Sequence, residues 1–528
     1  MHRELIETIR GMNPWWNDER WYEQDQDYKD RVRKSPFEHR WLRIIDKAVK
    51  ELIEGEGTFD MLILAGPRRT GKTSIMKRII EMNSDDTRKN FLYIALDDFI
   101  VRKHVENEGL RYILSEIINE EGVNEPMVII IDEASAIENW DIHVKNVFDF
   151  FAEAGKRFLM IVTGSLGLRL IEKSTNVLGR RGDIPALSRI ANPGLILPYK
   201  FSEFAEAIDE IRKFIKVSSL LCRDKRMKLL CKLAKKTKQE NGNDSLAIAA
   251  LEYAYEKFGE ELECWFLKYL MTGGYPLIVY ETLVKNQLHP KWYSEFSQII
   301  LEDIKYTNLR RDIAQCVLDY LREKSRMASL IDLDKLEGYV RNRANLSRSD
   351  LRQFRIEDYI KYFTGVNVFV KANSFPVSLK KSASHRKIKL FFLDPFLFHA
   401  VYFGEKIDPL NEVENMLRRN EQVGLLVEHI VCAHFFRLPK PILYYYIQEN
   451  SETQGEIDCI CYFNDMYIPV EIKYTESERR IAKEIEKILE ILEKIGVNAR
   501  PIVVSKNVLE LHCNDYVIIP AYLFLILF

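Results

Sequence analysis

The stretch GPRRTGKT at residues 66–73 has the composition of a phosphate-binding loop. Gly66 and Gly71 carry no Cβ, so backbone N–H groups can converge on a phosphate, and a helix beginning after the loop adds its positive dipole end. Lys72 is expected to reach the β- and γ-phosphates of a nucleotide, and Thr73 to hold Mg²⁺. The expected nucleotide contacts are Gly66, Pro67, Arg68, Arg69, Thr70, Gly71, Lys72, Thr73 and Ser74.

A second set of polar residues follows two apolar runs downstream of this loop. MVIIIDE ends in Asp132, expected near the Mg²⁺ shell, and Glu133, expected to polarise the attacking water. Thr163 and Ser165 end the run FLMIVTGS, where a polar side chain can sense the γ-phosphate. A buried strand that closes on solvated carboxylates is the alternative for the acid pair, and the preceding phosphate loop favours the functional interpretation.

Two arginines in NVLGRRGD are candidates for stabilising charge in the transition state. Arg180 and Arg181 could supply that charge or could be ordinary surface residues. Arg180 acting on a neighbouring copy would imply a ring, and Arg180 acting within its own chain would imply a monomer. The sequence leaves both questions open, including whether the chain forms a homo-oligomer.

The elements that must position these residues alternate between strands and helices. Residues 61–198 place short apolar runs between helix-like segments, which predicts a mainly parallel sheet covered on both faces. Residues 201–311 have apolar positions three and four apart, which predicts a helical lid or connector. Trp15 and Trp16 are interpreted as packing anchors.

The motifs of the first 210 residues resemble a known family. GPRRTGKT, IIIDE, TGS and LGRR followed by LPYKFSEF, with NPWW near the N-terminus, are similar to archaeal-type P-loop ATPases of the AAA+/STAND assemblage. The resemblance implies ATP binding and hydrolysis with Mg²⁺, and it places Lys72 and Asp132 at the nucleotide. The Arg68-Arg69 pair is not a fixed feature of that family.

A hairpin near the C-terminus, GEIDCICYFNDMYIPVEIKYTE at 455–476, gathers charged residues on one side. With Asn464 and Asp465 in the turn, Asp458 lies across from Glu471, and their Cβ atoms should be ~4.5–5.5 Å apart. The other side of the hairpin is apolar and predicts a core. Two facing carboxylates require compensation, which Mg²⁺ or Mn²⁺ could supply, and Lys473 could then orient water or stabilise a phosphate.

This hairpin is similar to the core of the PD-(D/E)xK nuclease fold, although the proline of that motif is missing from GEID. The resemblance implies a metal site formed by Asp458 and Glu471, with Lys473 as a catalytic residue. It also implies a contribution from Glu428 on a preceding helix. The alternative is a charge ladder in which Lys473 pairs with Glu456 and the acids are solvated.

Residues 312–405 have the order of a winged helix, with three helices followed by two strands. Three arginines on the third helix and two wing lysines suit phosphate contacts from DNA. A solvated face or a protein-docking surface is the alternative, because Glu357 and Asp358 interrupt the basic patch. The expected nucleic-acid contacts are Arg348, Arg352, Arg355, Lys380 and Lys381.

Length and composition set the frame for these motifs. A chain of 528 residues is too long for one core, and 77 basic against 79 acidic residues exclude a global basic field. Scattered cysteines indicate reduced thiols, and no stretch of ~18 apolar residues marks a membrane span, so we expect a cytoplasmic protein without membrane contact. The final IPAYLFLILF is expected to enter a core.

The predicted fold class is α/β, in four parts. These are a P-loop ATPase domain with an N-terminal extension (1–200), the helical connector (201–311), the winged helix (312–405) and a restriction-endonuclease-like α/β domain (406–528). The first hypothesis is a Mg²⁺-dependent ATPase that acts on DNA and carries a metal-dependent endonuclease. The alternatives are a STAND-like nucleotide-dependent switch and a DNA-binding ATPase whose C-terminal domain does not cleave.

Overall fold

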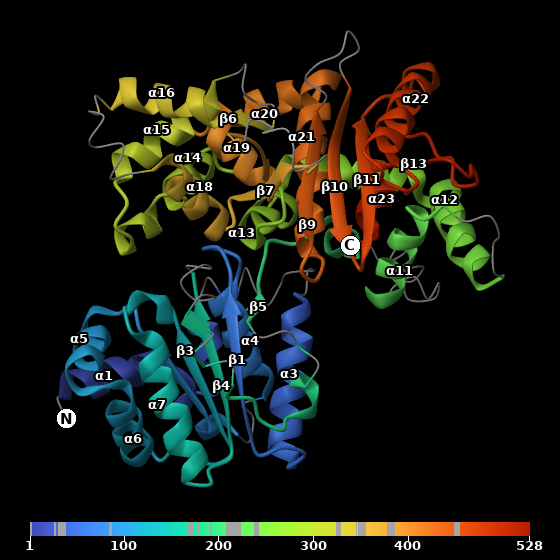
Figure 1. The fold of residues 1–528 in the computed structure, drawn as a ribbon. Helices are drawn as coiled ribbons and strands as arrows, with labels where there is room; N and C mark the ends of the chain where they lie inside the picture. Colours follow the sequence, from blue (N-terminus) through green and yellow to red (C-terminus); the bar gives the residue numbers. More distant parts are fainter. Residues whose placement is uncertain are drawn as a thin grey trace. The chain divides into compact units, whose positions relative to one another are not determined.

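Five apolar segments of the first 197 residues form a parallel sheet with the strand order β2-β3-β4-β1-β5 (Figure 1). The strands are β1 (Phe59–Ala65), β2 (Phe91–Ala95), β3 (Met127–Asp132), β4 (Phe158–Gly164) and β5 (Gly194–Leu195). The structure is a computed structural model, and it describes the whole chain except residues 1–2, 26–27, 30–38, 84–86, 166–172, 175, 178, 189, 191–192, 207–222, 237–241, 324–328, 345, 347–354, 377–385 and 448–454.

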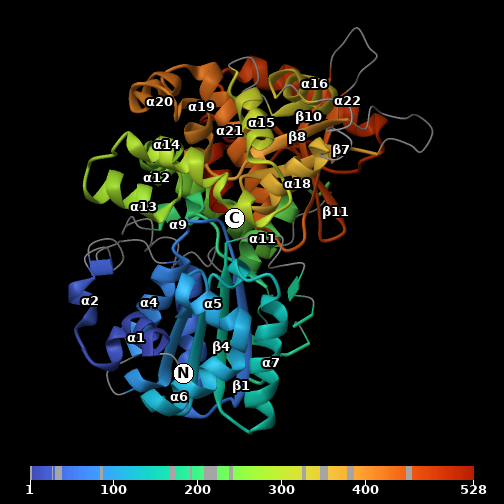
Figure 2. The same cartoon turned by 90° about the vertical axis from the view of Figure 1, so that its left-hand side faces the viewer.

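The central strands of this sheet are buried on both faces, as expected for continuous Val- and Ile-rich runs. Helices cover both sides, with α3 packed on α4 and α6 packed on α7 (Figures 1 and 2). The predicted parallel sheet is confirmed. The helices are α1 (Arg3–Met12), α2 (Trp21–Gln24), α3 (Arg40–Glu54), α4 (Lys72–Asn83), α5 (Phe99–Glu108), α6 (Leu110–Glu121) and α7 (Trp140–Glu153).

The chain divides into two compact units, Met1–Leu197 with Gly365–Asn367, and Pro198–Thr364 with Val368–Phe528. The second unit begins with helices, as the periodicity of residues 201–311 predicts. Its helices are α9 (Phe201–Ala205), α11 (Arg223–Leu233), α12 (Gly242–Thr272), α13 (Pro276–Val279), α14 (Lys291–Ile299), α15 (Arg311–Arg322), α16 (Leu333–Arg343), α18 (Ile356–Gly365), α19 (Pro395–Phe403), α20 (Pro409–Leu417), α21 (Asn420–His434), α22 (Glu478–Lys494) and α23 (Ala521–Ile526).

An eight-stranded mixed sheet runs through the second unit in the order β13-β12-β11-β10-β9-β7-β8-β6. The segments 312–405 and 406–528, which the sequence analysis treats separately, share this sheet because β7 pairs in parallel with β9 at two residues. The strands are β6 (Leu330–Asp332), β7 (Phe369–Ser374), β8 (Lys387–Phe392), β9 (Ile442–Ile447), β10 (Glu456–Phe463), β11 (Met466–Lys473), β12 (Ile502–Ser505) and β13 (Val517–Pro520).

The β10–β11 hairpin has the predicted register. Phe463 pairs with Met466 and Cys459 with Val470. Asn464 and Asp465 have φ angles of 49° and 59°, the left-handed conformation that a two-residue hairpin turn requires at both positions. A bulge does occur in β10, but it affects the pairing with β9 and leaves the β10–β11 register intact.

The hairpin does not have the solvated acids of the charge-ladder alternative, because Asp458 is 8% and Glu471 2% exposed. Ile460 is fully buried and belongs to the same apolar cluster as Ile457, together with residues of α22 such as Ile481. Both faces are therefore covered, because α22 packs on a strand whose bulge changes its alternation. The C-terminal segment enters a core as predicted, with Ala521–Leu525 of α23 buried. None of the described helices is long and apolar enough to cross a membrane.

Candidate functional site

The phosphate loop connects β1 to α4 and has the backbone geometry that its glycines predict. A Cβ on Gly66 would lie 2.1 Å from the carbonyl oxygen of Ile196, and Gly71 has a φ of +87°, so both positions require glycine. Thr70 Oγ1 donates a hydrogen bond of 2.9 Å to the carbonyl of Pro67, which holds the loop closed on itself. Lys72 begins α4, where backbone N–H groups are left for an anion.

Lys72 is buried and points back over its own loop. Its Nζ donates to the carbonyl oxygens of Gly66 at 3.0 Å and Pro67 at 2.9 Å, and lies 4.0 Å from Glu133 Oε1. The ammonium therefore lies inside the cradle that the loop forms, next to the acid predicted to activate water. Arg68 is half-buried and Arg69, with a φ of 62°, is exposed.

Asp132 ends β3 and is the centre of a hydrogen-bond network. Its Oδ2 accepts from Thr73 Oγ1 at 2.7 Å and from Tyr93 Oη at 2.7 Å. Its Oδ1 accepts from Glu133 N at 3.0 Å and from Thr163 Oγ1. Three hydroxyls from α4, β2 and β4 and the N–H of the following residue thus donate to one carboxylate that is 2% exposed, so Asp132 is held in a fixed orientation beside the loop.

Glu133 follows Asp132 in the left-handed region, with a φ of 49°, a strained conformation for a residue other than glycine. Its Oε2 accepts a hydrogen bond of 3.2 Å from Ser165 N. Burial raises the pKa of Glu133, and the Asp132 charge adds to this, while Lys72 and Arg68 act in the opposite direction. A half-buried carboxylate with a raised pKa next to the loop is suited to accept a proton from water.

The residues around Thr73 and Asp132 fit a Mg²⁺ ion. Mg²⁺ is bound in nucleotide sites by one or two protein oxygens together with phosphates and water, and a hydroxyl and a carboxylate oxygen lie 2.7 Å apart here. Among the described residues no group of three His, Cys, Asp or Glu side chains could hold a metal by itself. When bound, the ion would neutralise charge on the β- and γ-phosphates.

The two candidate arginines have protein partners. Arg180 forms a two-pronged ion pair with Asp149 of α7, with Nε–Oδ1 at 2.6 Å and Nη2–Oδ2 at 2.8 Å. Arg181 Nη2 donates to the carbonyls of Leu187 and Ile190, both at 2.8 Å. The surroundings of Arg181 are those of a structural residue, whereas the role of Arg180 stays a prediction.

The N-terminal segment forms one wall of a hollow of about 460 Å³ next to the phosphate loop. Trp15 and Trp21 line it together with Thr73, Lys77 and Tyr93. Trp15 is 1% exposed and donates its indole N–H to the carbonyl of Phe91, so it packs as predicted.

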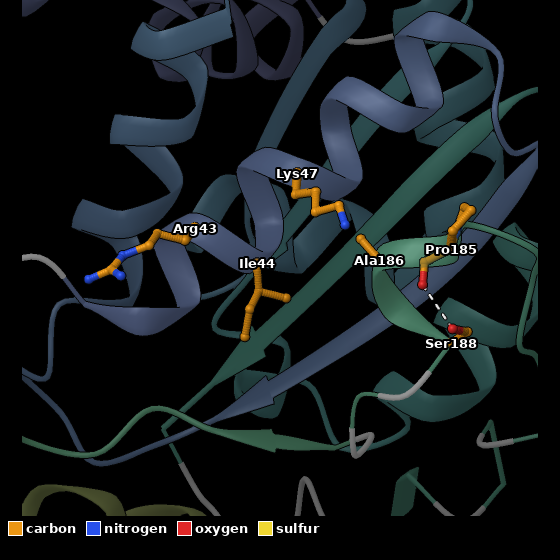
Figure 3. Close-up of a pocket in the computed structure, with 6 residues that line it drawn as sticks. All are labelled: Arg43, Ile44, Lys47, Pro185, Ala186 and Ser188. Atoms are coloured by element: carbon orange, nitrogen blue, oxygen red, sulfur yellow. Dashed lines mark hydrogen bonds between the residues drawn. The ribbon is translucent and has the colours of Figure 1, made fainter. Parts of the chain in front are cut away.

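A separate hollow of about 610 Å³ lies between α3 and the short helix Pro185–Leu187 (Figure 3). The view shows Lys47 directed toward Ala186, and Arg43 directed away from it. None of the residues predicted to carry chemistry lines this hollow. The lining residues are Arg43, Ile44, Lys47, Pro185, Ala186 and Ser188.

The predicted residues of the C-terminal site converge on one place in the second unit. The side chains of Asp458 on β10 and Glu471 on β11 each accept a hydrogen bond from the backbone of the other strand. Asp458 N donates to Glu471 Oε2 at 3.1 Å, and Ile472 N donates to Asp458 Oδ2 at 2.9 Å. Lys473 Nζ lies 2.9 Å from Glu471 Oε1. Glu428 on α21 reaches the same cluster through a shared ion-pair partner, Lys389.

Lys389 of β8, which the sequence analysis did not predict, contributes a second lysine to the cluster. Its side chain is 2% exposed, and its Nζ lies 2.7 Å from Glu456 Oε1. The alternative ladder, in which Lys473 pairs with Glu456, is contradicted, because Lys473 contacts Glu471 and, at 3.8 Å, Glu484.

Burial and the lysines set the pKa values of these groups. Burial raises the pKa of Asp458 to about 6 and that of Glu471 well above its usual value. Burial acts against the charged form of Glu428 as well, but Lys389, His429 and the Ser329 hydrogen bond together outweigh it, and the pKa of Glu428 is lowered. Burial also acts against the charged form of Lys389, but Asp458, Glu428 and Glu456 together overcome it and raise the pKa of Lys389 well above the usual value.

The expected nucleic-acid contacts are only partly within the described residues. Arg355 is exposed and directly precedes α18. Arg386, at the end of the predicted wing, forms ion pairs with Asp334, Glu337 and Glu357. Arg348, Arg352, Lys380 and Lys381 lie outside the described residues, so their predicted contacts stay predictions.

Sequence reasoning missed two functional candidates, Tyr93 and Lys389. A tyrosine within the apolar run FLYIAL, and a lysine within KIKLFFLD, are each polar interruptions of a predicted strand. Such interruptions indicate a buried partner for the polar group. They do not identify that partner, which lies on another element in both cases.

Three family models match separate parts of the chain. A model described as "AAA domain" matches residues 58–205, and two models described as domains of unknown function, DUF8612 and DUF4143, match residues 264–409 and 423–524. The AAA match spans the phosphate loop, Asp132, Glu133 and Ser165. Residues 58–205 are therefore an AAA-type P-loop ATPase domain, as the sequence motifs predict.

The chain is also similar to a curated relative and to solved structures. It is 26% identical over 236 residues to the uncharacterized protein MJ1637 of Methanocaldococcus jannaschii, which covers 43% of this chain and 45% of the relative's own length. The Aeropyrum pernix ORC1 protein in complex with DNA is 14% identical over 74% of this chain and 97% of that chain, with a TM-score of 0.32. A Thermotoga maritima RuvB variant is 14% identical over 66% and 94%, with a TM-score of 0.27.

Proposed function

We propose that this protein is a Mg²⁺-dependent ATPase that acts on DNA through a nuclease-like C-terminal site. The observation that carries the ATPase proposal is the convergence of Lys72, Thr73, Asp132 and Glu133. Lys72 and the loop amides would bind the phosphates, and Thr73 and Asp132 would hold the ion. Glu133, with its raised pKa, would orient and deprotonate the attacking water.

The proposal that the substrate is a nucleic acid is supported by the C-terminal cluster. Asp458, Glu471 and Lys473 are adjacent, and the Lys473 ammonium would stabilise negative charge on a phosphodiester held beside the two acids. The Lys473 side chain is one-third exposed and could contact a phosphate directly, whereas Asp458 and Glu471 are buried. PD-(D/E)xK-like chemistry is the finer part of this proposal.

The segment 312–405 is proposed as a winged helix that contacts DNA. Its described elements follow the order α15, β6, α16, α18, β7 and β8, with β8 between β6 and β7 in antiparallel pairing. Exposed Arg355 at the start of α18 is the described basic residue of the proposed contact surface. A helix presented beside a small antiparallel sheet suits docking into a groove.

A second candidate is an ATPase whose C-terminal domain binds DNA without cleaving it. The specific observation in favour is the ion pairing of Lys389 with Glu428 and Asp458, which gives those acids a partner other than a metal. A nucleotide-dependent switch of the STAND type would use the same phosphate loop and would bind a partner in place of DNA.

The ATPase proposal is tested by phosphate release from MgATP. Lys72→Ala should abolish turnover, because the γ-phosphate loses its charge partner. Lys156→Ala is the matched control, since Lys156 is 46% exposed and pairs with Glu125 on the surface of the same unit. Phosphate release that survives Lys72→Ala would refute the assignment.

The DNA proposal is tested by incubating the full chain with plasmid and linear DNA, in Mg²⁺ or Mn²⁺, with and without ATP. Cleavage that is lost in Asp458→Ala and Lys473→Ala would support a nuclease. DNA retention without cleavage would support the second candidate. Equal cleavage by the wild type and both variants would rule out the site, and neither retention nor cleavage would favour the switch.

A further inference from the structure

The cation at the centre of the C-terminal acids is a lysine side chain. Lys389 Nζ lies 2.7 Å from Glu456 Oε1, 3.0 Å from Glu428 Oε1 and 3.1 Å from Asp458 Oδ1. An ammonium has three N–H donors, and three carboxylates take all of them. Ser329 Oγ donates a further hydrogen bond of 2.5 Å to Glu428 Oε1, so this oxygen has two protein donors.

The other oxygens that a metal would need are also committed. Asp458 Oδ2 accepts from Ile472 N at 2.9 Å, and Glu471 Oε2 accepts from Asp458 N at 3.1 Å. Glu471 Oε1 contacts Lys473 Nζ at 2.9 Å. Both carboxylate oxygens of Asp458 and both of Glu471 therefore face a protein donor. Glu428 faces protein donors at Oε1.

A divalent ion does not fit this arrangement. Mg²⁺ requires oxygens at ~2.0–2.1 Å in an octahedron, and Asp458 Oδ1 and Glu428 Oε1 already face an ammonium that a metal would repel. We propose that Lys389 is a tethered cation that takes the place of a divalent ion, so that the Lys389 contact and metal binding at Asp458 are mutually exclusive. This inference deepens the proposed nuclease-like site and rests on it.

Lys389, which is proposed to keep a metal from Asp458, comes from a different segment of the chain than the acids it contacts. Lys389 belongs to β8, where it pairs with Ala372 of β7 and Leu330 of β6, in the segment proposed as a winged helix. In the sheet, β8 is separated from β10 by β7 and β9. A lysine of one segment is thus paired with three acids of the other, and a metal can enter only after Lys389 leaves Asp458.

The test is a titration of the full chain with Mn²⁺ in the absence of nucleotide and DNA. Electron paramagnetic resonance measures the bound Mn²⁺. Every protein carries Thr73→Ala, so that the phosphate loop contributes no hydroxyl ligand. The informative variant is Lys389→Met, which removes the charge and keeps the apolar stem. Lys371→Met is the matched control, because Lys371 is an exposed lysine on the adjacent strand β7.

Lys389→Met should bind one Mn²⁺ per chain at least about ten-fold more tightly than the parent protein, which carries only Thr73→Ala. The parent and the Lys371→Met control should both show no Mn²⁺ site with a Kd below ~1 mM. Adding Asp458→Asn to Lys389→Met should abolish the gain. If Lys389→Met is unfolded in metal-free buffer, adding Mn²⁺ should restore its thermal unfolding transition.

A parent that binds Mn²⁺ as tightly as Lys389→Met would overturn the inference, as would a folded Lys389→Met variant that gains no site. An unfolded variant that Mn²⁺ does not restore would overturn it as well. None of these measurements of Mn²⁺ binding and thermal unfolding uses DNA. Loss of DNA retention or cleavage by the wild type would therefore refute the proposed function separately from the metal exclusion.

Discussion

Replacing Tyr93 with phenylalanine removes one of the two side-chain donors to Asp132 Oδ2. The hydroxyl lies 2.7 Å from that oxygen, and Thr73 Oγ1 is the other donor at the same distance. A hydrogen bond to a charged acceptor contributes about 1.5–3 kcal/mol net. If Thr73 held a Mg²⁺ ion, Tyr93 would be the remaining side-chain donor to Asp132 Oδ2, so the cost should fall on the state that contains the metal.

The assay is the affinity for a fluorescent ATP analogue, measured with Mg²⁺ and again with EDTA. At about 1.5 kcal/mol, Tyr93→Phe should weaken binding about ten-fold in Mg²⁺ and leave the EDTA value unchanged. Tyr112→Phe, at a tyrosine that is 53% exposed in the same unit, should change neither value. Equal weakening in both buffers, or no weakening in Mg²⁺, would refute the role assigned to Tyr93.

Three further outcomes are expected. Gly66→Ala should weaken nucleotide binding about ten-fold or more, since its Cβ would meet the Ile196 carbonyl at 2.1 Å; unchanged affinity would disprove the close approach. Asp394 is the fully buried N-cap residue of α19, and burial raises its pKa from 3.8 to about 7. The wild type should therefore lose up to about 4 kcal/mol of unfolding free energy as pH rises from about 4 to 7, whereas Asp394→Asn should not. Urea denaturation at each pH measures the difference, and parallel curves would contradict it. Arg180→Ala should lower ATP turnover more than Asp149→Ala, because the arginine alone can meet phosphate charge; equal losses would assign the pair a structural role.

Local spacing predicted much of the first site. The loop, the strand before it and the helix after it are contiguous, so that Gly66, Lys72 and Thr73 take their places from chain geometry alone. Asp132 was predictable because the carboxyl ends of parallel strands meet at one edge of the sheet. Tyr93 was not, because β2 became the neighbour of β3 only through the strand order of the folded sheet.

The hairpin register was likewise determined by the sequence, because a two-residue turn with positive φ fixes every later pair. That register placed Asp458 beside Glu471. What compensates these acids was decided by the tertiary structure alone. Lys389 is 69 residues from Asp458 along the chain, and it reaches the cluster because β7 pairs with β9 and brings β8 into the sheet. Such long-range pairing depends on which apolar surfaces bury one another, and no spacing within either segment encodes it.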